Sequence, residues 1–320
     1  MTYTLCLYAL VIASATACSN GLAPNTQASA PRNDTNVAPT PIPSVSSVDQ
    51  TDAVTWWSSK TPCPDGATLK GSAPPAGSAV GCEMNGVLHG PRTLFHENGK
   101  RARSEVYYRG KLQGRFTSWH ATGGVEEEGS YRNGLLEGPV VRYYPNGAVH
   151  REGEFHQGKE SGAFKTYAEG GALLETVEYR EGKKHGLVRA YYDDGKPREE
   201  VEYAGNLRHG TARTFYPNGT KRSEGKYSND EQVGVWRSFR DNGKPMEELQ
   251  FAAGLKDGPT TQWQESGFKA LEGNYISDKK DGVFQYYAED GNLNKTEVYK
   301  AGKLVRVKKH GKKSGQIAQR

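Results

Sequence analysis

The sequence predicts an all-β protein, an elongated and twisted antiparallel meander made of nine β-hairpin repeats of 24 residues each. Three observations carry this prediction. A glycine recurs every 24 residues, nine times in succession, from Gly90 to Gly282, and a second glycine follows each of these after nine positions. Two aromatic positions recur with the same period. A fixed period of about 20 to 50 residues is the signature of a repeat architecture.

The aromatic positions form two columns through the array. The first column consists of Phe95, Trp119, Tyr143, Tyr167, Tyr191, Phe215, Phe239, Trp263 and Tyr287. The second column consists of Tyr107, Tyr131, Phe155, Tyr179, Tyr203, Tyr227, Phe251, Tyr275 and Tyr299. Together they use 18 of the 32 aromatic residues, so most of the apolar surface lies in the repeats. Tyrosine suits a sheet without a thick core, because its ring can pack while its hydroxyl meets water.

Each repeat contains two turn signals, which leave room for two strands but not for a helix. Residues 144–147 and 216–219 both read YPNG, a pattern typical of a type I turn followed by a glycine bulge. The second turn mostly ends in glycine, and Asn206, Asp230 and Asp278 replace it where it is missing. Asn and Asp tolerate the left-handed conformation best among non-glycine residues. Nine repeats therefore predict roughly 18 strands, which would extend over about 85 Å.

The glycine that opens each repeat, such as Gly138, falls inside a predicted strand. We expect it to offer bare backbone on which a neighbouring aromatic ring can lie. The composition agrees with a thin sheet, because only 35% of the residues are hydrophobic and the mean hydropathy is −0.79.

Residues 1–18 are predicted to form an export signal that ends in a lipobox. This apolar segment is too short to span a membrane and ends in Ala15-Thr16-Ala17-Cys18, which resembles a bacterial lipobox with lipidation at Cys18. Ala15 stands where leucine is usual, and no Lys or Arg precedes Arg32, so a plain signal peptide cut near Ala17 is the alternative. The prediction is an exported protein of the bacterial cell envelope, anchored at the outer membrane or periplasmic.

Two further segments precede the array. Residues 19–55 are rich in Pro, Ser and Thr and are predicted to be a disordered tether. Residues 56–89 contain Cys63 and Cys82, the two cysteines that remain outside the signal. In an oxidising compartment they predict a disulfide that staples an N-terminal cap onto the first hairpin, with metal binding as the weaker alternative. The repeats then occupy residues 90–302.

The charge distribution separates the array from the tail. Residues 84–302 hold 32 basic and 32 acidic residues, which argues against nucleic-acid binding. Residues 303–320 form a basic tail with seven basic residues and no acidic one. The tail, together with a lipid anchor, could contact a membrane surface; the alternative is a solvated end whose charge protects the last sheet edge.

No catalytic or metal-binding pattern stands out. The sequence lacks a P-loop, a dinucleotide fingerprint and the G-x-S-x-G and H-E-x-x-H motifs, so we expect no enzyme activity, cofactor or metal. A recurring glutamate column includes Glu128, Glu152 and Glu200. Its members would lie two strands apart, about 9.6 Å, which favours cross-strand ion pairs over a shared calcium ion.

Written as G-P-x-x-x-Y-Y-P-N-G-x-x-x-x-E-G-x-Y-x-N-G-K-x-x-G, the repeat resembles the MORN-repeat variant family, from Gly86 to about Leu304. The resemblance implies a β-hairpin interaction scaffold without catalytic residues, and such bacterial proteins are often described as antitoxin components of toxin–antitoxin systems. Three functions follow as hypotheses: an envelope-anchored scaffold for an unidentified protein partner, a cell-wall or glycan-binding module, and an antitoxin-like component. The two open edges of a meander also predict self-association.

Overall fold

The chain is described over residues 55–311 by a computed structural model, and strands dominate this part. A short 3-10 helix, η1 (Trp56–Ser58), precedes them. The predicted signal peptide with its lipidation site Cys18, the tether up to residue 54 and residues 312–320 of the basic tail lie outside the described residues.

The strands are β1 (Thr68–Ser72), β2 (Ala79–Met84), β3 (Val87–Phe95), β4 (Arg101–Tyr108), β5 (Lys111–Leu112), β6 (Gly114–Trp119), β7 (Val125–Arg132), β8 (Leu135–Leu136), β9 (Gly138–Tyr143), β10 (Val149–His156), β11 (Lys159–Tyr167), β12 (Leu173–Arg180), β13 (Lys183–Lys184), β14 (Gly186–Tyr191), β15 (Pro197–Ala204), β16 (Leu207–Phe215), β17 (Lys221–Ser228), β18 (Glu231–Phe239), β19 (Pro245–Ala252), β20 (Leu255–Trp263), β21 (Lys269–Ile276), β22 (Lys279–Lys280), β23 (Gly282–Tyr287), β24 (Leu293–Lys300) and β25 (Lys303–Lys309).

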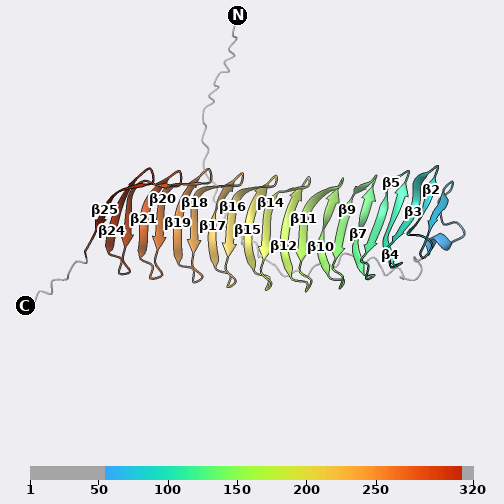
Figure 1. Ribbon diagram of the computed structural model, residues 1–320, viewed down its shortest axis with the longest axis horizontal. Helices are drawn as coiled ribbons and strands as arrows, with labels where there is room; N and C mark the ends of the chain where they lie inside the picture. The colour runs from blue at the N-terminus through green and yellow to red at the C-terminus, as the bar shows by residue number, and fades with distance from the viewer. Residues whose placement is uncertain (1–54, 312–320) are drawn as a thin grey trace, which may run out of the picture. The chain divides into compact units, whose positions relative to one another are not determined.

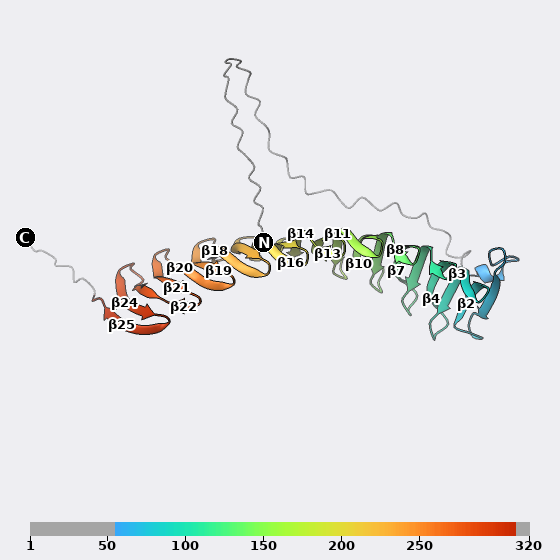
Figure 2. The same ribbon diagram turned by 90° about the horizontal axis from the view of Figure 1, so that it is seen from above.

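These strands form one antiparallel sheet in which each hairpin pairs with the next along the chain. Within residues 55–311 they follow one another in sequence order (Figure 1), and the view from above shows a single twisted layer (Figure 2). The two-residue strands β5, β8, β13 and β22 continue into the strands that follow them and pair with the same neighbour. The predicted all-β meander of hairpin repeats is therefore confirmed.

Both turns of the repeat have a backbone that matches their residues. In the first turn, Tyr144 N–H donates to Ala148 O at 2.8 Å and Gly147 N–H to Tyr144 O at 2.9 Å, as in a type I turn with a glycine bulge. In the second turn, both residues have positive φ, 54° at Asn133 and 88° at Gly134. This is the type I′ pattern, whose twist matches that of the flanking strands.

The repeat-opening glycine does not serve as a platform for a ring, contrary to our expectation. Gly138 has a φ of 83°, and a Cβ added there would meet no atom within 4 Å. The strand pairing at Gly162 shows why a glycine is needed: it lies at a bulge, where the register of β10 and β11 shifts between Glu152 and Glu154. The opening glycine is needed for a bulge with left-handed backbone, which residues with a Cβ rarely adopt.

A different glycine supports the rings. A Cβ at Gly153 would lie 2.4 Å from Phe164 Cδ1, and a Cβ at Gly225 would lie 2.1 Å from Trp236 Cδ2. Both glycines have ordinary φ, so the closeness of the ring, and not the backbone, excludes a side chain here.

One row of residues on one face of the sheet forms a thin core, which we call the apolar stripe. It consists of Phe116, Gly129, Val140, Gly153, Phe164, Val177, Val188, Val201, Ala212, Gly225, Trp236, Leu249, Thr260, Gly273 and Phe284, paired across the strands. Phe164 and Phe284 are 3% and 0% exposed, so even a single-layer sheet buries these rings. We call this side of the sheet the stripe face.

The segment before the array extends the sheet. Cys63 and Cys82 are joined by a disulfide, and Cys82 is buried in β2. Trp57 packs edge-on against Phe95 with ring centroids 5.7 Å apart. The predicted cap thus contains two strands, β1 and β2, together with packing onto the first repeat.

The basic segment that starts at Lys303 also enters the sheet. Its first seven residues form β25, which pairs with β24 as the last strand. The sequence suggested a tail outside the array here, because this segment lacks the glycine and aromatic positions of a repeat.

Candidate interaction surface

The two aromatic columns lie on opposite faces of the sheet, because side chains alternate along each strand. The second column flanks the apolar stripe: Tyr179 and Phe155 lie 5.1 and 5.5 Å from Phe164 between ring centroids. The first column lies on the other face. All 18 rings are half-buried. The structure therefore distributes these residues along the array and does not gather them into one site.

The first column is tied to the glutamate column of the preceding repeat. The hydroxyl of Tyr167 donates to Glu152 at 2.7 Å, and the hydroxyl of Tyr287 donates to Glu272 at 2.6 Å. The hydrogen bond to this carboxylate and burial raise the pKa of Tyr287 to about 12. These tyrosine hydroxyls are thus occupied inside the array.

Cations cover several rings of the second column. Arg208 lies 4.1 Å from the ring centre of Tyr227 and Lys280 lies 4.9 Å from that of Tyr299. Such pairs are attractive because the ring face is electronegative. They also reduce the ring surface that a ligand could reach.

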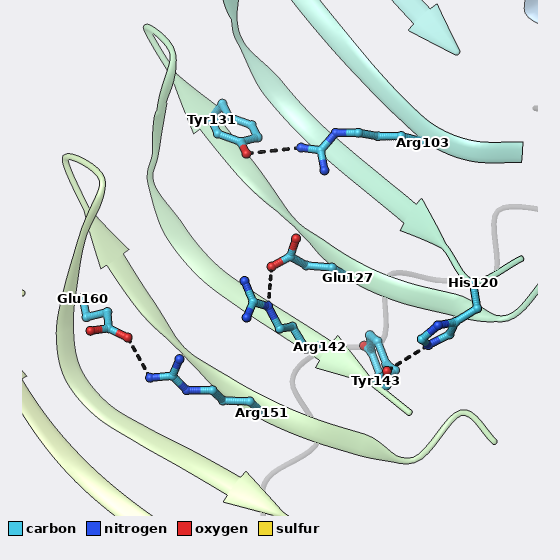
Figure 3. A network of polar contacts seen from close by, with 8 residues as sticks. All are labelled: Arg103, His120, Glu127, Tyr131, Arg142, Tyr143, Arg151 and Glu160. Atoms are coloured by element: carbon cyan, nitrogen blue, oxygen red, sulfur yellow. Dashed lines mark hydrogen bonds and ion pairs between the residues drawn. The ribbon is translucent and has the colours of Figure 1, made fainter. Parts of the chain in front are cut away.

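Polar contacts cross from strand to strand in the first repeats (Figure 3). Arg142 donates to Glu127 at 2.7 Å and Arg151 donates to Glu160 at 2.6 Å. The same kind of ion pair occupies the glutamate column, where Glu200 pairs with both Arg189 and Arg213. Like the Tyr167 and Tyr287 bonds, these pairs give the glutamates partners within the sheet, as expected for cross-strand pairing.

A ladder of side-chain hydrogen bonds links the first turns of successive repeats. The residue after the first aromatic column donates to a backbone carbonyl in the next repeat, for example His120 to Tyr143 O at 3.0 Å (Figure 3) and Tyr192 to Phe215 O at 2.7 Å. The donors are His96, His120, Tyr144, Tyr192, Tyr216, Arg240 and Gln264. Sequence reasoning missed this position, although long donor side chains occur there in all repeats except those with Ala168 and Ala288.

A buried glutamate closes each end of the apolar stripe. Glu105 is 4% exposed and accepts hydrogen bonds from Arg103 at 2.7 Å and Tyr107 at 2.8 Å. Glu297 is 9% exposed and lies 2.9 Å from both the Lys295 ammonium and the Tyr299 hydroxyl. Hydrogen bonds from Tyr286, Lys295 and Tyr299 lower the pKa of Glu297 to about 2.

The long edge of the sheet formed by the second turns carries exposed apolar side chains. Val87, Leu135, Leu207 and Leu255 each follow a second turn at equivalent repeat positions, and they are between 42% and 50% exposed. We call these four residues the apolar rim. The other repeats carry a charged residue at this position, so the apolar rim is a row of separate apolar side chains with charged residues between them: Lys111, Lys159, Lys183, Glu231 and Lys279.

The described residues hold no constellation for metal chemistry. Between residues 55 and 311, no group of three or more His, Cys, Asp or Glu side chains could hold a metal ion. The same part of the chain contains no helix long and apolar enough to cross a membrane.

Comparison with known proteins identifies the repeats. Six segments match the family model described as MORN repeat variant, at residues 112–133, 136–157, 184–204, 208–229, 232–253 and 280–301. No curated protein matches the chain.

Solved structures match at low identity. The crystal structure of the GtfA/B complex bound to UDP and GlcNAc is 16% identical over 39% of this chain and 22% of that chain, with a TM-score of 0.17. The crystal structure of TcdB2-TccC3-Cdc42 is 10% identical over 73% of this chain and 17% of that chain, with a TM-score of 0.18. The chain thus spans about a fifth of the length of these structures or less.

Proposed function

The chain belongs to the MORN-repeat variant family, and from this premise we propose that it is a non-catalytic scaffold that binds a partner protein at the bacterial cell envelope. The apolar rim is the observation that carries the proposal. It places an exposed apolar side chain at every second or third repeat along one edge of a sheet that hydrogen bonds hold together from repeat to repeat. A partner could contact several repeats of such an edge at once.

Two features support the envelope part of the proposal. The predicted signal and lipobox at residues 1–18 would export the chain and attach it through Cys18. The Cys63–Cys82 disulfide is a bond that persists in oxidising compartments.

The glycan-binding alternative has less support from the geometry. Sugar-binding aromatic residues need a free ring face, whereas the rings of the second column pack against the apolar stripe and carry cations. Several hydroxyls of the first column are held by glutamates. These contacts favour a structural role for both columns.

Site-specific photo-crosslinking in the native envelope tests the proposal. A crosslinking amino acid at position 135 or 207 places the probe on the apolar rim, and the same probe at exposed position 121 serves as the matched control near a first turn. We expect one protein to be crosslinked from the rim positions and not from position 121. Leu135→Ser with Leu207→Ser should reduce its capture without unfolding the array.

Recovery of wall fragments or lipopolysaccharide alone would favour the glycan-binding module. A crosslinked toxin encoded beside this gene would favour the antitoxin-like alternative. Equal crosslinking from position 121 and from the rim would remove the support that the rim gives to the scaffold.

A further inference from the structure

The last strand, β25, pairs differently from the repeat strands before it. In the repeats, the opening glycine forms a bulge that shifts the register by two residues, as where Tyr275 pairs with Lys280 and Glu272 with Gln285. In β25 the shift is one residue, because Tyr299 pairs with Leu304 and Val298 with Arg306.

Arg306 explains this difference. It lies 24 residues after Gly282 and so occupies the place of the opening glycine. Gly282 has a φ of 79°, a conformation that a residue with a Cβ adopts only at a cost in free energy. Without the two-residue bulge, Val307 pairs with Glu297, and β25 runs as an extended edge strand up to Lys309.

The edge strand is fixed along its length. Beyond its last residue, His310 N–H donates to Asn294 O at 2.7 Å, and His310 Nε2 lies 2.9 Å from Thr296 Oγ1. Backbone groups of an antiparallel strand alternate between its two neighbours. His310 points its N–H toward β24, so the N–H groups of every second residue before it, Lys308 and Arg306, also point toward β24. The N–H groups of the residues between them, Val307 and Lys309, therefore point outward, away from β24.

No strand among residues 55–311 pairs with this outer edge of β25. All seven of its residues are exposed, including Val305 at 65% and Leu304 at 52%. An exposed edge with free N–H and C=O groups is a template for an additional strand.

The charge of the edge decides which strand it can accept. β25 carries Lys303, Arg306, Lys308 and Lys309 and no acidic residue. The other end of the sheet, β1, carries Lys70 and no acidic residue either. Pairing of β25 with β25 or β1 of a second copy would place like charges side by side, which is unfavourable.

We propose that the outer edge of β25 binds an extended acidic segment of a partner protein as an additional antiparallel strand. The proposal rests on the proposed scaffold function and gives the chemistry of the partner: backbone hydrogen bonds from Val307 and Lys309 provide the pairing, and the four cations select acidic side chains. The same cations prevent the chain from assembling end to end.

Peptide binding to the full-length chain tests this proposal. The probe is a labelled, end-capped peptide of alternating threonine and glutamate, and a peptide of alternating threonine and lysine is its control. We expect binding of the acidic probe alone at low salt. Val307→Pro removes one outward N–H and should weaken binding by up to about tenfold, the effect of one lost hydrogen bond. Val307→Thr keeps that N–H and should bind like the unchanged chain.

Hydrogen exchange shows whether Val307→Pro unfolds β25 or removes only its outward N–H group. The amides of Arg306 and Lys308, which face β24, should stay protected in Val307→Pro, and the acidic probe should protect the amides of Val307 and Lys309 in the unchanged chain. Equal binding to Val307→Pro, binding of the lysine peptide or no binding would overturn the proposal. Concentration-dependent self-association would instead identify a second copy as the occupant. Rim crosslinking in Val307→Pro reports on the scaffold function independently.

Discussion

At the scale of single residues, glycines with the same period have different physical tasks. All opening glycines have positive φ, and Gly138 in addition has open space around it, so the backbone conformation is what these glycines share. Gly153 has ordinary φ but lies directly under the ring of Phe164. The first kind sets the bulge that re-aligns the strands, and the second kind lets a ring pack against the sheet.

Alanine substitutions distinguish these two tasks. Gly153→Ala should lower the free energy of unfolding by about 2 kcal/mol, because its Cβ forces Phe164 out of place. Gly138→Ala should cost about 1 kcal/mol, through backbone strain alone. Gly170→Ala is the matched control, since it has neither positive φ nor a neighbour within 4 Å, and it should change stability by less than about 0.5 kcal/mol.

Urea denaturation measures all three changes. Phe164→Leu combined with Gly153→Ala should cost less than the sum of the single changes if the ring is the cause, because the two residues are in contact. Equal losses for Gly153→Ala and Gly170→Ala would contradict the ring contact.

The residues that predict the repeat are visible in the sequence, but their contacts are not. Spacing alone identified Gly138 as periodic, yet it gave no information on which side of the sheet a ring would lie. The contact between Gly153 and Phe164 depends on pairing between β10 and β11 after a bulge, and the bulge changes the register by two residues. A sequence period shows which positions are equivalent, but it does not show which residues these positions contact in the sheet.

At the scale of elements, hairpins are joined by ladders at both long edges of the sheet. At the second turns, backbone N–H groups reach the previous repeat, as from Gly158 to Leu136 O at 2.9 Å. At the first turns, side chains reach the next repeat, as from Tyr216 to Phe239 O at 2.9 Å. A single sheet has no second layer to hold its strands, so these edge contacts replace part of what a core would supply.

A conservative change tests the first-turn ladder. Tyr192→Phe removes the hydroxyl that donates to Phe215 O at 2.7 Å, and it should lower the free energy of unfolding by about 1 kcal/mol. Tyr191→Phe is the matched control in the same repeat. Its hydroxyl lies 3.5 Å from Thr176 Oγ1, at the limit of a hydrogen bond, so the loss should be below about 0.5 kcal/mol. Chemical denaturation compares both variants, and a larger loss for Tyr191→Phe would refute the ladder.

The elements were predictable where turn chemistry sets them and unpredictable where it does not. The first turns, which all end in glycine, and the second turns define the hairpins of the array, and the structure has hairpins there. β25 could not be predicted in this way, because Arg306 replaces the glycine and no aromatic residue follows in phase. The strand forms because β24 offers an edge to pair with, a feature of the folded array and not of the local sequence.

At the scale of the whole described array, each hairpin pairs only with the hairpins before and after it, and the sheet stays open at both ends. Stability in such arrays is the sum of repeat terms and nearest-neighbour terms. A disturbance at one end should therefore remain local. The buried glutamates at the two ends of the apolar stripe make this expectation accessible to experiment.

Acid should loosen the array from its C-terminal end. The folded-state pKa of Glu297, about 2, is lower than the value of about 4.3 for an unperturbed glutamate. Its stabilising contribution is therefore fully present above about pH 4.3 and is lost as the pH falls through about 2. Between these values the folded Glu297 carboxylate is still ionised, whereas the same carboxylate in an opened strand binds a proton, so acid favours opening and strands β24 and β25 should open before the centre of the array.

Limited digestion with pepsin, which is active in acid, can locate this opening. Cleavage within residues 293–309 should increase between about pH 4 and pH 2 in the unchanged chain, while strands β10 to β16 stay intact. Glu297→Gln cannot ionise, so its cleavage there should differ little between the two pH values when enzyme activity is matched. The same acid dependence in Glu297→Gln would show that another group is responsible. Simultaneous cleavage at both ends and the centre would show that the array unfolds as one cooperative unit, against the nearest-neighbour description.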